Sequence, residues 1–153
     1  MILACRSTTK GEAAKELIES SVPLSPGIVE VWPLDLCSFE SVKEFCRRAV
    51  TTLDRIDMVL ANAAVMIHKM AQAPDAGGFE TTIATNVVST LLMALMLLPK
   101  MRTAAAQHNV TPCLTFVVSD AHCFVTSRIS SAPGNINYPV AGRIHGAVGA
   151  RYI

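Results

Sequence analysis

The sequence predicts an α/β fold built on a doubly wound parallel sheet, with helices on both of its faces. Short unbroken apolar runs alternate with segments of helical period along most of the 153 residues. Strands that are buried on both faces form such continuous runs, whereas strands with one wet face alternate apolar and polar residues. A polar residue also follows each apolar run, as expected where parallel strands end at a shared ligand-binding edge.

The first elements follow one another closely. Ile2–Cys5 is a short apolar run and predicts a buried strand. Residues 11–20 carry Ala, Leu and Ile at helical spacing with Glu and Lys on the other side, which predicts an amphipathic helix. Residues 28–34 are rich in β-branched side chains and end at Asp35, so they predict the second strand.

The later elements alternate in the same way. Ser38 offers an N-cap for a helix whose apolar positions run to Val50. Residues 56–61 predict the third strand, residues 79–101 predict one long helix, and residues 112–118 predict the last strand. The middle of the long helix is apolar nearly all round, which indicates burial in a core or at a subunit interface.

One domain is expected, because 153 residues suffice for one ordinary domain and not for two. Residues 1–125 carry the regular pattern and predict this domain. Residues 126–153 are rich in Ser, Pro, Gly and Asn and predict an irregular C-terminal segment. Hydrophobic residues make up 51% of the chain, which excludes a disordered linker.

Charge and composition argue against several classes of protein. Thirteen basic and twelve acidic residues without clusters, together with 5% aromatic residues, argue against a nucleic-acid binder. The longest apolar stretch, residues 91–98, is far shorter than the ~20 residues of a membrane span, and Arg6 interrupts the apolar N-terminus too early for a signal peptide. We therefore expect a cytoplasmic protein without a membrane span.

The cysteines give no sign of a metal site. Five cysteines are scattered along the chain without a Cys-x-x-Cys pair or a Cys/His spacing that suits zinc. We expect them to be buried free thiols in a reducing compartment.

Four polar residues follow four of the predicted strands: Arg6, Asp35, Asn62 and Ser119. Taken singly, each is explained by a turn or a cap. Because the carboxyl ends of parallel strands meet at one edge of a sheet, the four equivalent positions together favour a ligand-binding site.

Several segments carry a family resemblance. They are Leu3-Ala4-Cys5-Arg6-Ser7, Leu34-Asp35-Leu36, Ala61-Asn62-Ala63-Ala64, Thr85-Asn86-Val87, Leu98-Pro99-Lys100-Met101 and Val118-Ser119-Asp120-Ala121-His122. In this order and spacing they resemble the short-chain dehydrogenase/reductase family, in particular its retinol-dehydrogenase-like branch, over residues 2 to about 125.

The resemblance implies a Rossmann-like fold that binds a nicotinamide cofactor. It implies that Ser119 positions a substrate carbonyl, that Asn86 supports a proton relay through its backbone carbonyl, and that Tyr152 is the candidate proton donor. Asp35 would meet the adenine ring. The other residues implied to line the cofactor are Ser7, Leu36, Asn62, Ala63 and Ala64.

Arg6 favours NADP over NAD as the cofactor. A guanidinium group at the end of the strand can hold the ribose 2′-phosphate by a bidentate, charge-assisted contact. No acidic residue stands at this strand end to prefer a free 2′-hydroxyl.

Two family motifs are absent from the 153 residues. The family's Thr-Gly-x-x-x-Gly-x-Gly turn, which brings backbone amides to the pyrophosphate, does not occur. The Tyr-x-x-x-Lys pair fails at Tyr138, which is followed four residues later by Gly142, and has no lysine position after Tyr152. We therefore expect a sequence truncated at both ends and inactive by itself.

Two functions stay open. The first is an NADP-dependent oxidoreductase acting on a small-molecule carbonyl or alcohol, in secondary-metabolite biosynthesis. The second is an inactive family member that pairs with a full-length relative through residues 79–101, a helix that would also join two copies of this chain. A serine hydrolase using Ser119 and His122 is disfavoured, because the Gly-x-Ser-x-Gly turn is missing.

Overall fold

The computed structural model describes residues 1–22, 27–67 and 71–119. The chain divides into two compact units, Met1–Val117 and Val118–Ile153, and the elements below belong to the first unit. The expected domain boundary after residue 125 and the segment 126–153 lie outside the described residues, so both stay predictions.

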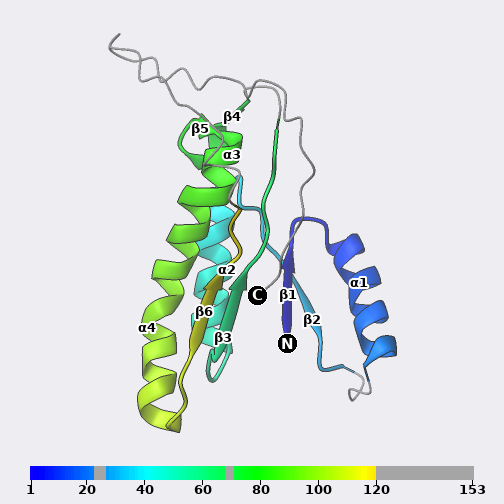
Figure 1. The fold of residues 1–153 in the computed structure, drawn as a ribbon, viewed down its shortest axis with the longest axis vertical. Coiled ribbons are helices and arrows are strands. Elements are labelled where there is room, and N and C mark those ends of the chain that lie inside the picture. Colours follow the sequence, from blue (N-terminus) through cyan, green and yellow to red (C-terminus); the bar gives the residue numbers. More distant parts are fainter. Residues whose placement is uncertain (23–26, 68–70, 120–153) are drawn as a thin grey trace. The chain divides into compact units, whose positions relative to one another are not determined.

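Four strands form two parallel pairs (Figure 1). The strand β1 (Ile2–Cys5) pairs with β2 (Glu30–Pro33), and β3 (Met58–Ala61) pairs with β6 (Cys113–Phe116). All four strands were predicted, but three are shorter than the apolar runs that predicted them. Within the described residues β1 and β3 share no ladder, so the parallel strands form two two-stranded sheets rather than one continuous sheet.

Helices cover both faces of the β1–β2 pair, as a doubly wound fold requires. The helix α1 (Thr8–Ser21) packs on the face that carries Val31, because Gly11 lies against that side chain. The helix α2 (Phe39–Thr52) packs on the opposite face, where Trp32 meets Phe45 edge to face at 6.0 Å between ring centroids. Successive residues of a strand face opposite sides, so the two helices cover opposite faces.

The capping serine predicted for α2 is confirmed. Ser38 has extended backbone angles, and its side chain accepts a hydrogen bond from the backbone amide of Ser41 at 3.3 Å. This bond satisfies one of the free amides at the start of the helix. Ser7 caps α1 in the same way, through the backbone amide of Lys10.

The long helix begins later than predicted. Phe79 and Glu80 form a short strand, β5 (Phe79–Glu80), which pairs antiparallel with β4 (Gln72–Ala73) across the short helix η1 (Pro74–Ala76). Gly77 and Gly78 adopt positive φ angles of 71° and 74°, which glycine tolerates without strain, and close this turn. The helix then runs as α3 (Thr81–Ile83), a π-helical segment η2 (Ala84–Ser89) and α4 (Thr90–His108).

The long helix also ends later than predicted, because Pro99 does not stop it. Pro99 lies inside α4, where it removes one backbone hydrogen bond and crowds the carbonyl four residues earlier, and the helix continues past it nonetheless. The Ala-rich segment that follows favours helix strongly. The helix ends where Asn109 takes a left-handed conformation with φ 50°, a common helix terminator.

One hydrophobic core joins α2 and α4 to both parallel strand pairs. Its buried members are Trp32, Leu36, Val42, Cys46, Ala49, Ile56, Ala61, Met93, Leu97 and Met101. Residues 81–108 are long and apolar enough to cross a membrane by length and composition, and the core helix of a soluble domain passes the same test. Met93, Leu97 and Met101 give this helix a buried side within the described fold.

Among the described cysteines, the expectation of buried thiols is confirmed only for Cys46 and is clearly wrong for Cys113. Cys46 is buried, Cys5 and Cys37 are half-buried, and Cys113 is exposed. Cys113 lies on a strand with little cover on its outer side, since Thr115 on the same face is also exposed. Cys123 lies outside the described residues.

Candidate functional site

The first predicted site residues lie where β1 ends and α1 begins. Arg6 is exposed directly after β1, and Ser7 is the N-cap of α1. The first turn of α1 holds no acidic residue, and the exposed Lys10 adds a second positive charge there. Within the described residues Arg6 makes no ion pair. The helix N-terminus and both cations make this end of the sheet favourable for an anion.

Asp35 and Leu36 lie beside this position, after β2. The ladder continues past the strands, because the backbone amide of Leu34 donates to the carbonyl of Cys5 at 3.0 Å. The Asp35 carboxylate accepts a hydrogen bond from the amide of Cys37 at 2.8 Å, which fixes the turn. The Leu36 side chain is buried in the core, so this residue can offer a ligand only its backbone.

The loop after β3 carries Asn62, Ala63 and Ala64, all of which are exposed. Two hydrogen bonds fix the loop just beyond them. Asn86 accepts a bond from the amide of Val65 through Oδ1 and donates one to the carbonyl of Val65 through Nδ2, both at 2.8 Å. The side chain of Asn86 is therefore fully engaged in holding this loop, a role that the sequence did not reveal.

Asn86 lies in the π-helical segment η2, where an α-helix was predicted. A π-helical turn inserts one extra residue and disturbs the regular i to i−4 hydrogen bonding, and such turns are frequent at functional sites. The hydroxyl of Thr90 caps the carbonyl of Thr85 at 2.8 Å within this disturbed turn. The long helix is thus irregular at Asn86, the residue whose backbone carbonyl the family resemblance implies in a proton relay.

One contact ties the two parts of the site together. The thiol of Cys37, after β2, lies 3.1 Å from the hydroxyl of the buried Thr85, next to Asn86. The structure therefore links the loop that holds Asp35 to the helix that holds Asn86. Cys37 and Thr85 are 48 positions apart, and no local sequence pattern signals their contact.

The other two predicted catalytic residues, Ser119 and Tyr152, are not placed relative to this site. Ser119 is exposed beyond the end of β6 and belongs to the second compact unit. Tyr152 lies outside the described residues, as do Tyr138 and His122. In the part of the chain that the structure describes, no cluster of His, Cys, Asp and Glu could hold a metal ion.

The side-chain carboxyl of Glu80, at the start of the long helix, has a lowered pKa. Burial raises the pKa of this carboxyl, but hydrogen bonds from the backbone amides of Thr82 and Ile83 and from the Thr82 hydroxyl outweigh burial, so the pKa lies below its usual value. Glu80 is the N-cap residue of α3, and its charge also complements the helix dipole.

The comparisons with known proteins identify the family. Residues 1–110 match the family model described as short chain dehydrogenase. The chain therefore belongs to the short-chain dehydrogenase/reductase family, as its motifs predicted, and the Rossmann-like fold class is confirmed.

Fungal members of the family are clearly similar to this chain. It is 41% identical over 133 residues to the short chain dehydrogenase/reductase dmxR8 of Cryptosporiopsis sp., covering 87% of this chain and 40% of that protein. It is also 41% identical over 124 residues to the short chain dehydrogenase atnD of Emericella nidulans, covering 80% and 38%. The chain thus spans about 40% of the length of these two relatives.

Solved structures agree on the fold. A chain described as a short-chain dehydrogenase/reductase from Burkholderia xenovorans superposes with a TM-score of 0.60 at 17% identity, covering 80% of this chain and 45% of that chain. A chain described as the carbonyl reductase Sniffer of Caenorhabditis elegans gives 0.57 at 20% identity, covering 77% and 50%. At these identities the likeness concerns the fold alone.

Proposed function

We propose that the protein containing this chain is an NADP-dependent oxidoreductase that interconverts a small-molecule carbonyl and its alcohol. The observation that supports it is the position of Arg6, exposed between the end of β1 and the capped N-terminus of α1. A bidentate guanidinium, a helix N-terminus and the nearby Lys10 all favour a phosphate dianion. An enzyme that uses NAD would gain little from this arrangement.

The residues of this chain would bind and orient the reactants. A bound nicotinamide supplies or accepts the hydride. Arg6 and Ser7 would hold the adenosine phosphate, and Asp35 would meet the adenine ring. Asn62, Ala63 and Ala64, and the backbone of Leu36, would line the rest of the cofactor.

Three residues are proposed for the chemistry itself. Ser119 would position the substrate carbonyl by a hydrogen bond, and Tyr152 would donate or accept the proton. Asn86 would support the relay through its backbone carbonyl, since its side-chain amide already bonds Val65.

Titration with adenosine fragments tests the cofactor assignment without requiring turnover. Calorimetry of the 153-residue chain should show tighter binding of 2′,5′-ADP than of 5′-AMP, because only the former carries the 2′-phosphate. Arg6→Ala should abolish this preference, whereas Arg102→Ala, an exposed arginine on α4, should retain it. Equal affinity of the unmodified chain for both fragments would refute the assignment to NADP.

The relatives bear on the substrate class. They are described as short-chain dehydrogenases of fungi. We propose that this protein acts in secondary-metabolite biosynthesis, in the cytoplasm. Assays of the whole protein with NADPH and panels of ketones and aldehydes test this. A protein that oxidises or reduces none of them would contradict it.

A second candidate function is pairing without catalysis, as an inactive member that binds a full-length relative. The observation that favours it is the exposed apolar side of the long helix, which includes Leu91 and Leu95. Two measurements separate the two functions. If the chain acts by pairing, it should co-purify with a co-expressed full-length relative. The isolated chain should then show no detectable binding of 2′,5′-ADP.

A further inference from the structure

Ser89 and Thr90 are neighbours where η2 meets α4, yet their hydroxyl groups differ in hydrogen bonding. Ser89 is 0% exposed, and its hydroxyl has no hydrogen-bond partner within the part of the chain that the structure describes. The hydroxyl of Thr90, which is also buried, donates to the carbonyl of Thr85 at 2.8 Å. A buried hydroxyl without a partner destabilises a fold, so the place of Ser89 needs a physical reason.

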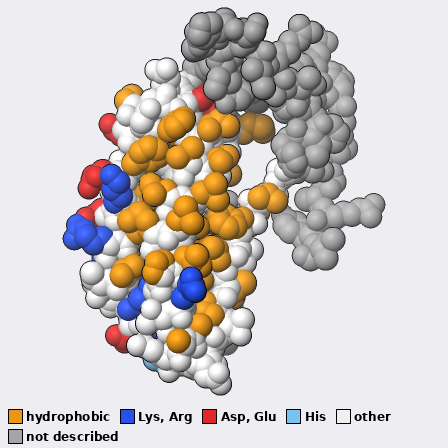
Figure 2. All heavy atoms as spheres, turned by 90° about the vertical axis from the view of Figure 1, so that its left-hand side faces the viewer, with side chains coloured by type: hydrophobic (Ala, Val, Ile, Leu, Met, Phe, Trp, Pro, Cys, Tyr) orange, Lys and Arg blue, Asp and Glu red, His pale blue; other side chains and the backbone are white. Residues whose placement is uncertain are grey.

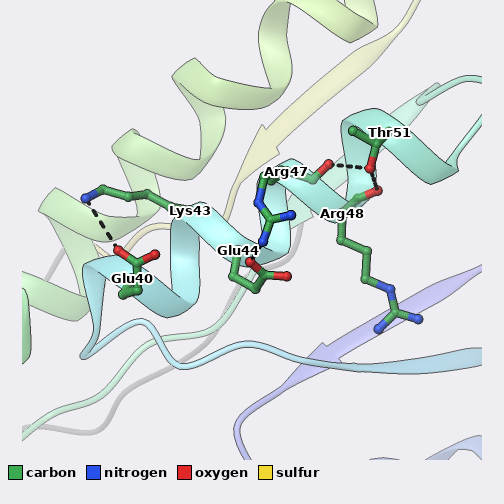
Figure 3. Close-up of polar contacts among 6 residues, drawn as sticks. All are labelled: Glu40, Lys43, Glu44, Arg47, Arg48 and Thr51. Atoms are coloured by element: carbon green, nitrogen blue, oxygen red, sulfur yellow. Dashed lines mark hydrogen bonds and ion pairs between the residues drawn. The ribbon is translucent and has the colours of Figure 1, made fainter.

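A regular α-helix would give Ser89 a partner. Within α2 the hydroxyl of Thr51 donates to the carbonyl of Arg47, four residues earlier, at 2.9 Å (Figure 3). Serine and threonine hydroxyls in helices commonly bond back in this way. By the same rule the acceptor for Ser89 is the carbonyl of Thr85, which in the π-helical segment accepts from Thr90, five residues later. The π-helical register thus leaves Ser89 unpaired, whereas an α-helical register would pair it.

Water does not satisfy Ser89 from outside the fold. The outer side of the long helix is apolar at this level, where Val87 and Leu91 are 45% and 49% exposed. Figure 2 shows apolar side chains gathered over that side of the molecule. The hydroxyl oxygen of Ser89 has almost no accessible surface in the described fold. The missing hydrogen bond therefore counts fully against the π-helical register.

The side chain of Asn86 favours the π-helical register. It bonds the amide and the carbonyl of Val65, both at 2.8 Å. An α-helix turns by about 100° per residue, so losing the extra residue of the π-helical turn would rotate Asn86 away from Val65. The carbonyl of Asn86 would then lie within reach of the hydroxyl of Thr90, four residues later. The α-helical register would thus break the loop contact and occupy the carbonyl for which a relay is proposed.

We propose that Ser89 is a positioning residue for Asn86, because its hydroxyl gives this segment of the long helix a second register. The unpaired hydroxyl of Ser89 favours the α-helical register, and the contact of Asn86 with Val65 favours the π-helical one. Asn86 is therefore in place only while the loop after β3 holds it. The consequence for the relay rests on the proposed function, whereas the two registers follow from the hydrogen bonds of this chain alone.

Urea unfolding of the 153-residue chain in a double-mutant cycle tests the two registers. Ser89→Ala removes the unpaired hydroxyl and should lower the unfolding equilibrium constant at least about fivefold. Asn86→Ala breaks the Val65 contact, after which the segment takes the α-helical register and Ser89 recovers a partner. Asn86→Ala should therefore raise the unfolding constant at least about fivefold more in the Ser89→Ala background than in the unmodified chain.

Gln107→Ala is the control for this cycle, since Gln107 is exposed in the last turn of α4. Its effect should be the same with and without Ser89→Ala. Additive effects of Asn86→Ala and Ser89→Ala would overturn the proposal, because they mean that the register does not change. Destabilisation by Ser89→Ala alone would also overturn it.

Deuterium exchange of the Val65 amide, followed by nuclear magnetic resonance, reports the position of Asn86 directly. Ser89→Ala should slow this exchange at least about fivefold, because it raises the free energy of the register that releases Val65. Thr103→Val is the matched control: it removes a hydroxyl that donates to the carbonyl of Pro99 at 3.1 Å, and it should not slow the exchange. Unchanged exchange in Ser89→Ala, or equal slowing by both variants, would overturn the proposal.

A crystal structure of the Asn86→Ala variant shows the register itself. Residues 81–108 should form one regular α-helix, with the hydroxyl of Ser89 within hydrogen-bond distance of the carbonyl of Thr85. A π-helical turn that persists in this variant would overturn the proposal. None of the three measurements involves a cofactor or turnover, so a failure of the proposed oxidoreductase activity leaves their outcome unaffected.

Discussion

Asn86 holds the loop after β3 through both polar atoms of its side-chain amide. Replacing it by Ala leaves the amide and the carbonyl of Val65 unpaired in a half-buried position. Loss of these bonds should lower the free energy of unfolding by about 1–3 kcal/mol, measured by urea denaturation. Asn86→Asp should also destabilise, because a carboxylate cannot donate to the Val65 carbonyl.

Gln107→Ala is the control for Asn86, since Gln107 is exposed in the last turn of α4. It should change stability by less than about 0.5 kcal/mol. Equal effects of the Asn86 and Gln107 variants would contradict the role assigned to Asn86.

Cys46 makes stability depend on pH in the alkaline range. Burial raises the pKa of its thiol from 9.0 to about 11. Between these values the unfolded chain releases the proton while the folded chain keeps it, so the unfolded state binds fewer protons and stability falls as pH rises. The contribution of Cys46 to this fall approaches about 1.4 kcal/mol per pH unit.

The comparison with Cys46→Ala isolates this contribution from that of other titrating groups. Urea unfolding at pH 8.5, 9.5 and 10.5 should give a steeper decline for the unmodified chain than for the variant. Parallel declines would show that the thiol is not the group responsible.

At the scale of elements, Gly11 decides how closely α1 approaches the sheet. A Cβ atom at this position would lie 2.5 Å from Sγ of Cys5 and 2.6 Å from Cγ1 of Val31. Ala raises helix propensity by up to about 1 kcal/mol, but overpacking against a stiff β-branched side chain costs about 1–3 kcal/mol. Gly11→Ala should therefore destabilise the fold despite its better propensity.

A second substitution checks the cause. Val31→Ala should make Gly11→Ala less costly than it is in the unmodified chain, because it removes one of the two clashing groups. Additive losses in the double variant would show that the close approach is not the reason.

The sequence predicted the order and type of the main elements well, because their signals are local. Ser38 as a cap and the apolar run of β1 each need only a few neighbouring residues. The end of the long helix was missed, because the predicted helix stopped at Met101, before the Ala-rich segment that carries it on to His108. The π-helical turn and the contact of Cys37 with Thr85 depend on tertiary packing, which no local pattern encodes.

The site was predictable to a similar degree. The polar residues at the strand ends follow from parallel topology, so the positions of Arg6 and Asp35 just beyond β1 and β2 could be predicted from the sequence, while their roles toward a cofactor stay predictions. The pairing of Asn86 with Val65 joins positions 21 residues apart and required the fold. Lys10 was missed, although its place in the first turn of a helix after Arg6 was a usable signal.

At the scale of the whole molecule, burial is distributed unevenly among the helices. In α1 only Gly11 is buried, whereas α2 buries Val42, Cys46 and Ala49, and α4 buries six residues. A helix with fewer buried contacts exposes less apolar surface when it opens locally. The free energy of local opening is therefore lower for such a helix. Backbone amides of α2 and α4 should exchange with deuterium at least tenfold more slowly than those of α1 under native conditions. Mass spectrometry of peptides from the three helices measures this, and equal protection of α1 and α4 would mean that the fold opens only as one unit.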